Sequence, residues 1–137
     1  MAENGRLHVE VVSPEKILYS GEGEMVVCRT AEGDIAFLPG HAPFLGALGV
    51  AKVRVILPDG EQVVAVHAGF VEVSNNRVVV LSDVAELPEQ IDVGRAESAK
   101  QRAEAALASN ENDPEAIAAR DRAELRLDIA GVSSSIA

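Results

Sequence analysis

The chain has 137 residues, with 12 Lys and Arg against 22 Asp and Glu, which gives a net charge of −10 and a pI near 4.7. This acidic balance argues against a nucleic-acid partner, which requires a basic face, and against electrostatic docking on anionic lipid. A single cysteine, Cys28, excludes an intrachain disulfide and a zinc cluster built from cysteines.

The longest uncharged run covers residues 35–51 and is interrupted by two prolines and three glycines. A membrane-spanning helix needs about 20 consecutive, mostly apolar residues, so we interpret this run as loop and buried strand. The first six residues are polar and do not resemble a signal peptide. We therefore expect a soluble chain with no direct insertion into lipid.

Composition changes near Glu86. Seventeen of the nineteen valines and all four aromatic residues lie in residues 1–86, whereas residues 87–137 hold twelve alanines. Valine and aromatic residues favour strands, and alanine favours helix. The sequence thus predicts an α+β chain with one domain over residues 1–86 and a second over 87–137.

In the first half, apolar and polar residues alternate with a period of two, as in the run from Leu7 to Val11. Turn signals such as Pro58-Asp59-Gly60 and Ser74-Asn75-Asn76 recur about every 8–12 residues. This spacing is typical of a small antiparallel β-sandwich or barrel.

In the second half, alanines recur at steps of three and four residues, first over 96–106 and again over 116–130. Asp92 and Asp113 are candidate N-caps, and Pro114 suits a first helical position. We expect an antiparallel two-helix hairpin whose tail, residues 131–137, is frayed. A buried methyl group contributes only about 0.8 kcal/mol, so this hairpin should be marginally stable alone.

The usual catalytic motifs are missing: the sequence has no nucleophile elbow, no phosphate-binding loop and no His-Glu-x-x-His. The three histidines are scattered, so we expect no metal site. Cys28, flanked by Val26, Val27 and Arg29 in a strand pattern, is interpreted as a half-buried packing residue. We therefore predict no catalytic residues.

Two features are more specific. Residues 31–45, rich in glycine and proline, are either a long turn between strands or a shaped loop for a protein partner. Arg95 and Arg102 are seven residues apart, and Arg122 and Arg126 are four apart, so each pair shares one helix face. These arginines either form surface ion pairs or meet a polyphosphate by bidentate hydrogen bonds.

Three segments together resemble a known family. They are the run Glu32-Gly33-Asp34 with Leu38-Pro39-Gly40-His41-Ala42-Pro43, the strand pair 69–73 and 80–86, and the helix start Ile91-Asp92-Val93-Gly94-Arg95-Ala96. In order and over nearly the full length, they resemble the epsilon subunit of bacterial F-type ATP synthases, which corresponds to the delta subunit in mitochondria.

The resemblance implies a non-catalytic rotor subunit that couples the flow of protons or sodium ions to ATP synthesis. Residues 1–86 would bind the gamma subunit and the ring of c subunits, with Glu32, Asp34 and His41 as candidate ring contacts. Residues 87–137 would regulate the enzyme, extending along gamma to the catalytic subunits and inhibiting ATP hydrolysis. It implies a peripheral protein on the cytoplasmic face of the cell membrane.

In some members of that family, ATP binds the hairpin through an Ile/Leu-Asp-x-x-Arg-Ala motif and arginines of both helices. No cofactor is required, and ATP would be a regulatory ligand. The matching residues here are Glu86, Ile91, Asp92, Arg95, Ala96, Arg102, Arg122 and Arg126. The alternatives are a free-standing nucleotide-sensing module of the same fold and a small all-β enzyme.

Overall fold

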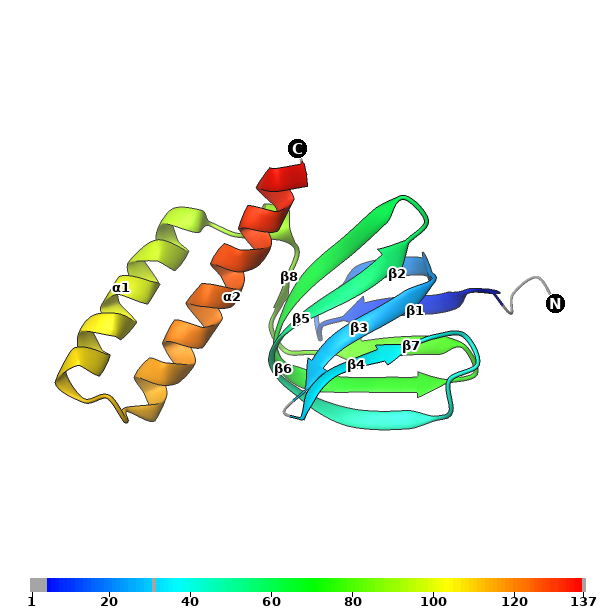
Figure 1. Ribbon diagram of the computed structural model, residues 1–137, viewed down its shortest axis with the longest axis horizontal. Coiled ribbons are helices and arrows are strands. Elements are labelled where there is room, and N and C mark those ends of the chain that lie inside the picture. Colours follow the sequence, from blue (N-terminus) through cyan, green and yellow to red (C-terminus); the bar gives the residue numbers. More distant parts are fainter. Residues whose placement is uncertain (1–4, 31, 137) are drawn as a thin grey trace. The chain divides into compact units, whose positions relative to one another are not determined.

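The computed structural model describes residues 5–30 and 32–136, and the chain divides into two compact units, Met1–Leu87 and Pro88–Ala137. A β-sandwich followed by two helices confirms the predicted fold class (Figure 1). The strands are β1 (Leu7–Val12), β2 (Ile17–Gly23), β3 (Met25–Thr30), β4 (Gly33–Phe37), β5 (Phe44–Leu57), β6 (Gly60–Ser74), β7 (Arg77–Leu81) and β8 (Ala85–Glu86).

The strands form one folded sheet with the order β2-β1-β7-β6-β5-β3-β4, and β8 pairs with β6. Every pairing is antiparallel except that of β1 with β7, which is parallel. The prediction of an antiparallel sandwich missed this pair because hairpin turns show only neighbouring strands. β1 and β7 are joined by a long stretch of chain, so no tight turn fixes their direction.

The long hairpin of β5 and β6 belongs to both layers of the sandwich. Near its turn, β5 pairs with β3 through residues 53–56, and near its open end, β6 pairs with β7 through residues 70–74. Between these regions the ladder skips Gly49 and Ala68, since Leu48 pairs with Gly69 and Val50 with His67. Both strands bend there, so that their halves lie in different layers (Figure 1).

The bend also changes which residues face the core. Val64 and Val66 are buried in the core before the skipped Ala68, and Val71 and Val73 are buried after it. One residue of each strand is left out of the ladder, and the alternation reverses there because the side-chain period is two. The resulting core is mostly valine, with Phe37 as its largest fully buried side chain.

Cys28 lies in this core and is fully buried, so the expectation of a half-buried thiol was wrong. Desolvation by burial raises the pKa of the Cys28 thiol to about 12. A thiol of this kind stays protonated at neutral pH and is unreactive, so Cys28 is a packing residue.

The corner at Ala68 requires unusual backbone geometry. Ala68 has a φ of 71°, in the left-handed region that glycine adopts more easily. The Ser82 hydroxyl lies within hydrogen-bond distance of the carbonyl oxygens of both Ala68 and Val84 and thereby fastens the corner to the segment after β7. A Cβ on the next residue, Gly69, would lie 2.1 Å from the Leu81 carbonyl oxygen, so only glycine fits there.

Two turns differ in how well the sequence predicted them. The turn at Asn75 and Asn76 has φ values of 51° and 60°, which confirms the tight hairpin expected from these residues. The prediction of a single turn or loop over residues 31–45 was wrong, because β4 occupies its middle and pairs with β3. Only residues 38–43 connect β4 to β5.

The second unit starts with a short 3-10 helix, η2 (Pro88–Gln90), and continues with α1 (Val93–Ser109) and α2 (Pro114–Ile136). The two helices pack through alanines at the predicted spacing, of which Ala96, Ala103, Ala116 and Ala123 are buried. Both predicted caps are present, at Asp92 and Asp113. The helix α2 continues to Ile136, so the expectation of a frayed tail from residue 131 was wrong.

We predict that Ala68→Gly stabilises the protein by about 0.5–1 kcal/mol. Glycine removes the cost of the left-handed backbone, and its greater freedom in the unfolded chain offsets part of that gain. The measurement is the urea midpoint of the sandwich. Ala51→Gly is the control, since Ala51 is buried in β5 with an ordinary φ, and it should be destabilising. Equal losses in both variants would contradict the prediction.

Candidate functional site

The start of α1 positions the charged residues that the sequence analysis assigned to a nucleotide. The Asp92 carboxylate accepts a hydrogen bond from the Arg95 backbone N–H, with Oδ1 and N 3.1 Å apart. This bond satisfies one of the unpaired N–H groups of the first turn and fixes where the helix begins. With the register set in this way, Ala96 is buried while Arg95 and Arg102 are exposed.

A pocket of about 380 Å³ lies against this face of α1, and its lining residues are Asp92, Gly94, Arg95, Ser98 and Arg102. Three of the predicted residues, Asp92, Arg95 and Arg102, are therefore brought together. Neither guanidinium forms an ion pair with another described residue. Two uncompensated cations beside a pocket favour an anionic ligand, and guanidinium groups suit phosphate oxygens.

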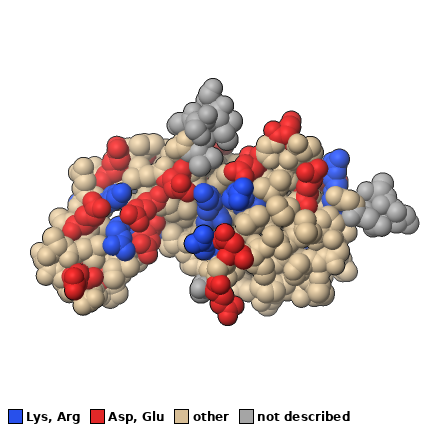
Figure 2. Space-filling model, viewed as in Figure 1, with Lys and Arg blue, Asp and Glu red and all other residues tan. Residues whose placement is uncertain are grey.

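The α2 arginines lie in a different environment. Arg122 and Arg126 are both half-buried, and Arg122 makes no ion pair within the described part of the chain. The surface ion pairs are made by Arg120, whose guanidinium lies 3.5 Å from Asp121 and 4.0 Å from Glu124. Figure 2 shows acidic and basic side chains interspersed over the visible face of the helical unit.

The other predicted nucleotide residues are placed less directly. Ile91 is half-buried after η2, and its N–H donates to the Pro88 carbonyl oxygen at 3.2 Å. Ala96 is buried, which assigns it a packing role between α1 and α2. Glu86 belongs to the sandwich unit, as the last residue of β8.

Glu86 has a partner that sequence reasoning missed. The His67 Nε2 lies 3.0 Å from the Glu86 Oε1, and the two side chains are 4% and 25% exposed. Because an ionised carboxylate only accepts hydrogen bonds, Nε2 is the donor. No local signal could have predicted this pair, since the residues are nineteen positions apart and meet only because β8 pairs with β6.

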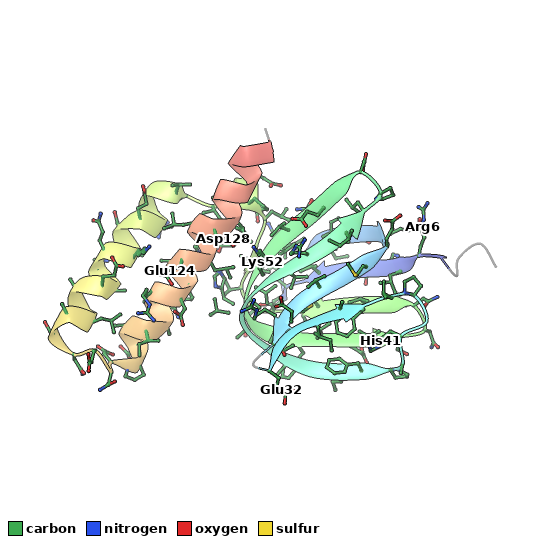
Figure 3. The ribbon with its side chains drawn as sticks, in the orientation of Figure 1. Arg6, Glu32, His41, Lys52, Glu124 and Asp128 are labelled. Carbon is green, nitrogen blue, oxygen red and sulfur yellow. The ribbon has the colours of Figure 1, made fainter. Side chains whose placement is uncertain are left out.

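The predicted ring contacts do not lie together. Glu32 is exposed in the turn between β3 and β4, whereas His41 lies in the connection at the other end of β4 (Figure 3). Asp34 is paired with Arg29, with Nε and Oδ1 2.6 Å apart. That hydrogen bond, with the attraction between the charges, raises the pKa of the Arg29 guanidinium.

His41 is held by aromatic neighbours. Its ring stands edge-on to Phe37, with the centroids 5.0 Å apart, and its Nδ1 lies 2.7 Å from the Ala42 carbonyl oxygen. The same connection is anchored to the β6–β7 turn, because the Gly40 N–H donates to Asn76 Oδ1 at 2.7 Å. These contacts fix the conformation of the connection that carries His41.

The sandwich also carries an apolar pocket of about 700 Å³ that the sequence analysis did not predict. Phe70 and Leu81 are cross-strand partners on its wall and are 56% and 48% exposed. The sequence held a signal for this apolar surface, because the alternation of each strand places these two large apolar residues on its outward face. The full lining is Val12, Ser13, Pro14, Ala47, Leu48, His67, Ala68, Gly69, Phe70, Leu81, Ser82 and Asp83.

Other kinds of site find no support in the described residues. They contain no group of three or more His, Cys, Asp or Glu side chains that could hold a metal ion. Over the same residues, neither α1 nor α2 combines the length and the apolar character that a membrane-spanning helix needs.

Comparison with known proteins identifies the family. The family model for the beta-sandwich domain of the ATP synthase delta/epsilon chain matches residues 6–88. The ATP synthase epsilon chain of Halalkalibacterium halodurans is 45% identical over 129 residues, which cover 91% of this chain and 97% of that protein. This chain belongs to the ATP synthase epsilon chain family.

Further epsilon chains agree, such as that of Alkalihalophilus pseudofirmus, which is 46% identical over 78% of this chain and 80% of its own length. Among solved structures, a chain of the Euglena gracilis mitochondrial ATP synthase matches with a TM-score of 0.68 at 20% identity, covering 97% of this chain and 82% of that one. This likeness supports the fold. The resemblance stated from sequence is confirmed, and the residue assignments within the family stay predictions.

We predict that Asp92→Ala lowers the stability of the helical unit by about 1 kcal/mol, because it removes the cap of α1. Asp92→Asn should lower the stability by only a few tenths of a kcal/mol, since asparagine is also a good N-cap residue. The measurement is the loss of helical circular dichroism on heating. If the alanine and asparagine variants melt together, the cap does not have this role.

Proposed function

We propose that the chain is a non-catalytic rotor subunit of an F-type ATP synthase that links the gamma subunit to the ring of c subunits. The observation that carries this proposal is its similarity to ATP synthase epsilon chains along most of its length. In this role it transmits rotation driven by protons or sodium ions. It works as a peripheral protein at the cytoplasmic face of the membrane.

The gamma subunit is proposed to dock on the apolar pocket of the sandwich. Support comes from Phe70 and Leu81, which expose large apolar side chains on neighbouring strands. Exposed apolar patches of this kind are typical of protein interfaces, where their burial drives association. A hydrophobic surface of gamma is the partner that fits this pocket.

The ring contact is proposed at the β3–β4 turn. Glu32 is exposed at its tip, and the Arg29–Asp34 pair closes the strands behind it. His41 lies at the opposite end of β4, so we keep Glu32 and Asp34 as ring contacts and omit His41. The Arg29–Asp34 pair holds the ends of the two strands together, and this suits a contact that must carry torque, because less entropy is lost on binding.

We predict that the two contacts can be separated in a reconstitution with gamma and the c-ring. Leu81→Asp should reduce capture of gamma at least tenfold, because it places a charge in an apolar interface. Glu32→Lys should keep gamma and lose the ring. Leu38→Asp is the control, since Leu38 is 54% exposed, does not line the pocket and follows β4 at the end opposite Glu32. Retention of both partners by Leu81→Asp and Glu32→Lys would contradict the assignments.

The helical unit is proposed to bind ATP and thereby regulate the enzyme. Support comes from the pocket of α1, which Arg95 and Arg102 line, and from Arg122 and Arg126 on α2. The helices pack through alanines, which bury little area, so the arrangement of the hairpin can change at modest cost. ATP at 100 times its dissociation constant would stabilise the form that binds it by about 2.7 kcal/mol.

Without ATP, the hairpin is proposed to extend along gamma, reach the catalytic subunits and inhibit ATP hydrolysis. Attraction to an acidic surface requires free cations on α2. Arg120 is paired with Asp121 and Glu124, and Glu124 also lies 3.8 Å from Lys100. Among the α2 arginines, Arg122 makes no ion pair with another described residue, so inhibition by this chain is proposed to depend mainly on Arg122.

We predict that ATP binds the full chain in calorimetric titration, with and without magnesium, and that Arg122→Ala and Arg126→Ala each weaken binding at least tenfold. A charge-assisted hydrogen bond contributes about 1.5–3 kcal/mol, which corresponds to this loss. Arg120→Ala is the control on the same helix and should bind normally. Absence of binding to the native chain would leave a coupling subunit whose regulation does not come from ATP.

A further inference from the structure

The arginines and glutamates of α1 lie on different sides of its axis, and Lys100 falls on the glutamate side. At about 100° per residue, Arg95, Ser98 and Arg102 fall within about 60° of one another. Glu97 and Glu104 fall on roughly the opposite side. The one carboxylate in the pocket, that of Asp92, already accepts the Arg95 backbone N–H at 3.1 Å. This face is therefore positive and offers hydrogen-bond donors.

Ser98 lies between the two arginines on this face and lines the same pocket. Its side chain is exposed, and it forms no hydrogen bond with another described residue. Serine hydroxyls inside helices often bond to the carbonyl four residues earlier, so an uncommitted hydroxyl here is available to a ligand. A hydroxyl can donate to a phosphate oxygen while the guanidinium groups neutralise its charge.

Gly94 leaves open space in the pocket, because it has no side chain. It lies one helical turn before Ser98 and also lines the pocket. A Cβ built at Gly94 would contact only Asp92 Oδ1, at 3.6 Å, so no packing demands a glycine here. Glycine weakens a helix relative to alanine. A large side chain at this position would project over the Ser98 hydroxyl.

We propose that Gly94 and Ser98 form a phosphate seat between Arg95 and Arg102, in which the Ser98 hydroxyl donates to a phosphate oxygen of a nucleoside polyphosphate. This inference rests on the proposed ATP binding and adds two residues that the family motif does not specify. The arginines supply the charge, Ser98 supplies a directed donor, and Gly94 leaves the space that the phosphate occupies.

The test is calorimetric titration of ATP into the full chain and its variants. Ser98→Ala should weaken binding about tenfold while the helix melts no earlier, because alanine favours helix over serine. Ser98→Thr keeps a hydroxyl and should restore most of the affinity. Ser109→Ala, at the far end of α1, is the matched control and should bind as the native chain does.

The role of Gly94 is tested by varying the size of the side chain at this position. Gly94→Ala should bind ATP within about twofold of the native chain, since the pocket has room for a methyl group. Gly94→Leu should abolish binding by filling the seat. Because the Ser98→Ala chain still binds ATP, the ³¹P spectrum of bound ATP gives a second measurement. A phosphorus resonance should differ between the native and Ser98→Ala complexes.

Two results would contradict the phosphate seat even if the native chain binds ATP. In the first, Ser98→Ala and Gly94→Leu bind ATP as tightly as the native chain. In the second, the ³¹P spectra of the native and Ser98→Ala complexes are identical. If the native chain binds no ATP, the proposed regulation and the seat fall together. A tenfold loss in Ser98→Ala that Ser98→Thr reverses would support the seat.

Discussion

One hairpin, β5–β6, serves both layers of the sandwich because its ladder skips Gly49 and Ala68. The skipped residues let each strand bend and reverse its inward face, so that valines on both sides of the bend reach one core. The same corner positions the other features of the unit. Ala68 and Gly69 line the apolar pocket, and His67 meets Glu86 of β8. The pocket, the corner and the His67–Glu86 hydrogen bond are therefore parts of one arrangement.

The helical unit follows a different physical principle. The sandwich is held by a continuous core of branched side chains, whereas α1 and α2 meet through alanines. Helices that meet through alanines bury little apolar area. Electrostatic interactions and helix capping therefore contribute a larger share of the stability of this unit. The Lys100 Nζ on α1 lies 3.8 Å from the Glu124 Oε2 on α2. Both side chains are partly exposed, so this ion pair contributes little to stability. A unit of this kind suits regulation by a bound anion.

Periodicity predicted both units, because alternating valines and stepped alanines are local signals that their elements obey. It failed where the pattern was short or reversed. The strand β4 has only five residues between glycine-rich and proline-rich segments, so its alternation is too short to predict a strand. The spacing of Arg95 and Arg102 predicted that they share one helix face, and both line the same pocket. The pairs His67–Glu86 and Arg29–Asp34, like the apolar pocket, depend on strand pairing that one sequence does not specify.

Asn76 joins three segments through separate groups. Its backbone takes the left-handed conformation of the β6–β7 turn, its carbonyl oxygen accepts the His8 N–H at 2.8 Å, and its side-chain oxygen accepts the Gly40 N–H. In most hairpins of this type, glycine replaces asparagine freely, since only the backbone conformation matters. Here glycine would preserve the turn and release the segment that carries His41. The turn conformation alone would allow either asparagine or glycine at position 76. The hydrogen bond to Gly40, 36 residues away in the chain, requires the asparagine side chain.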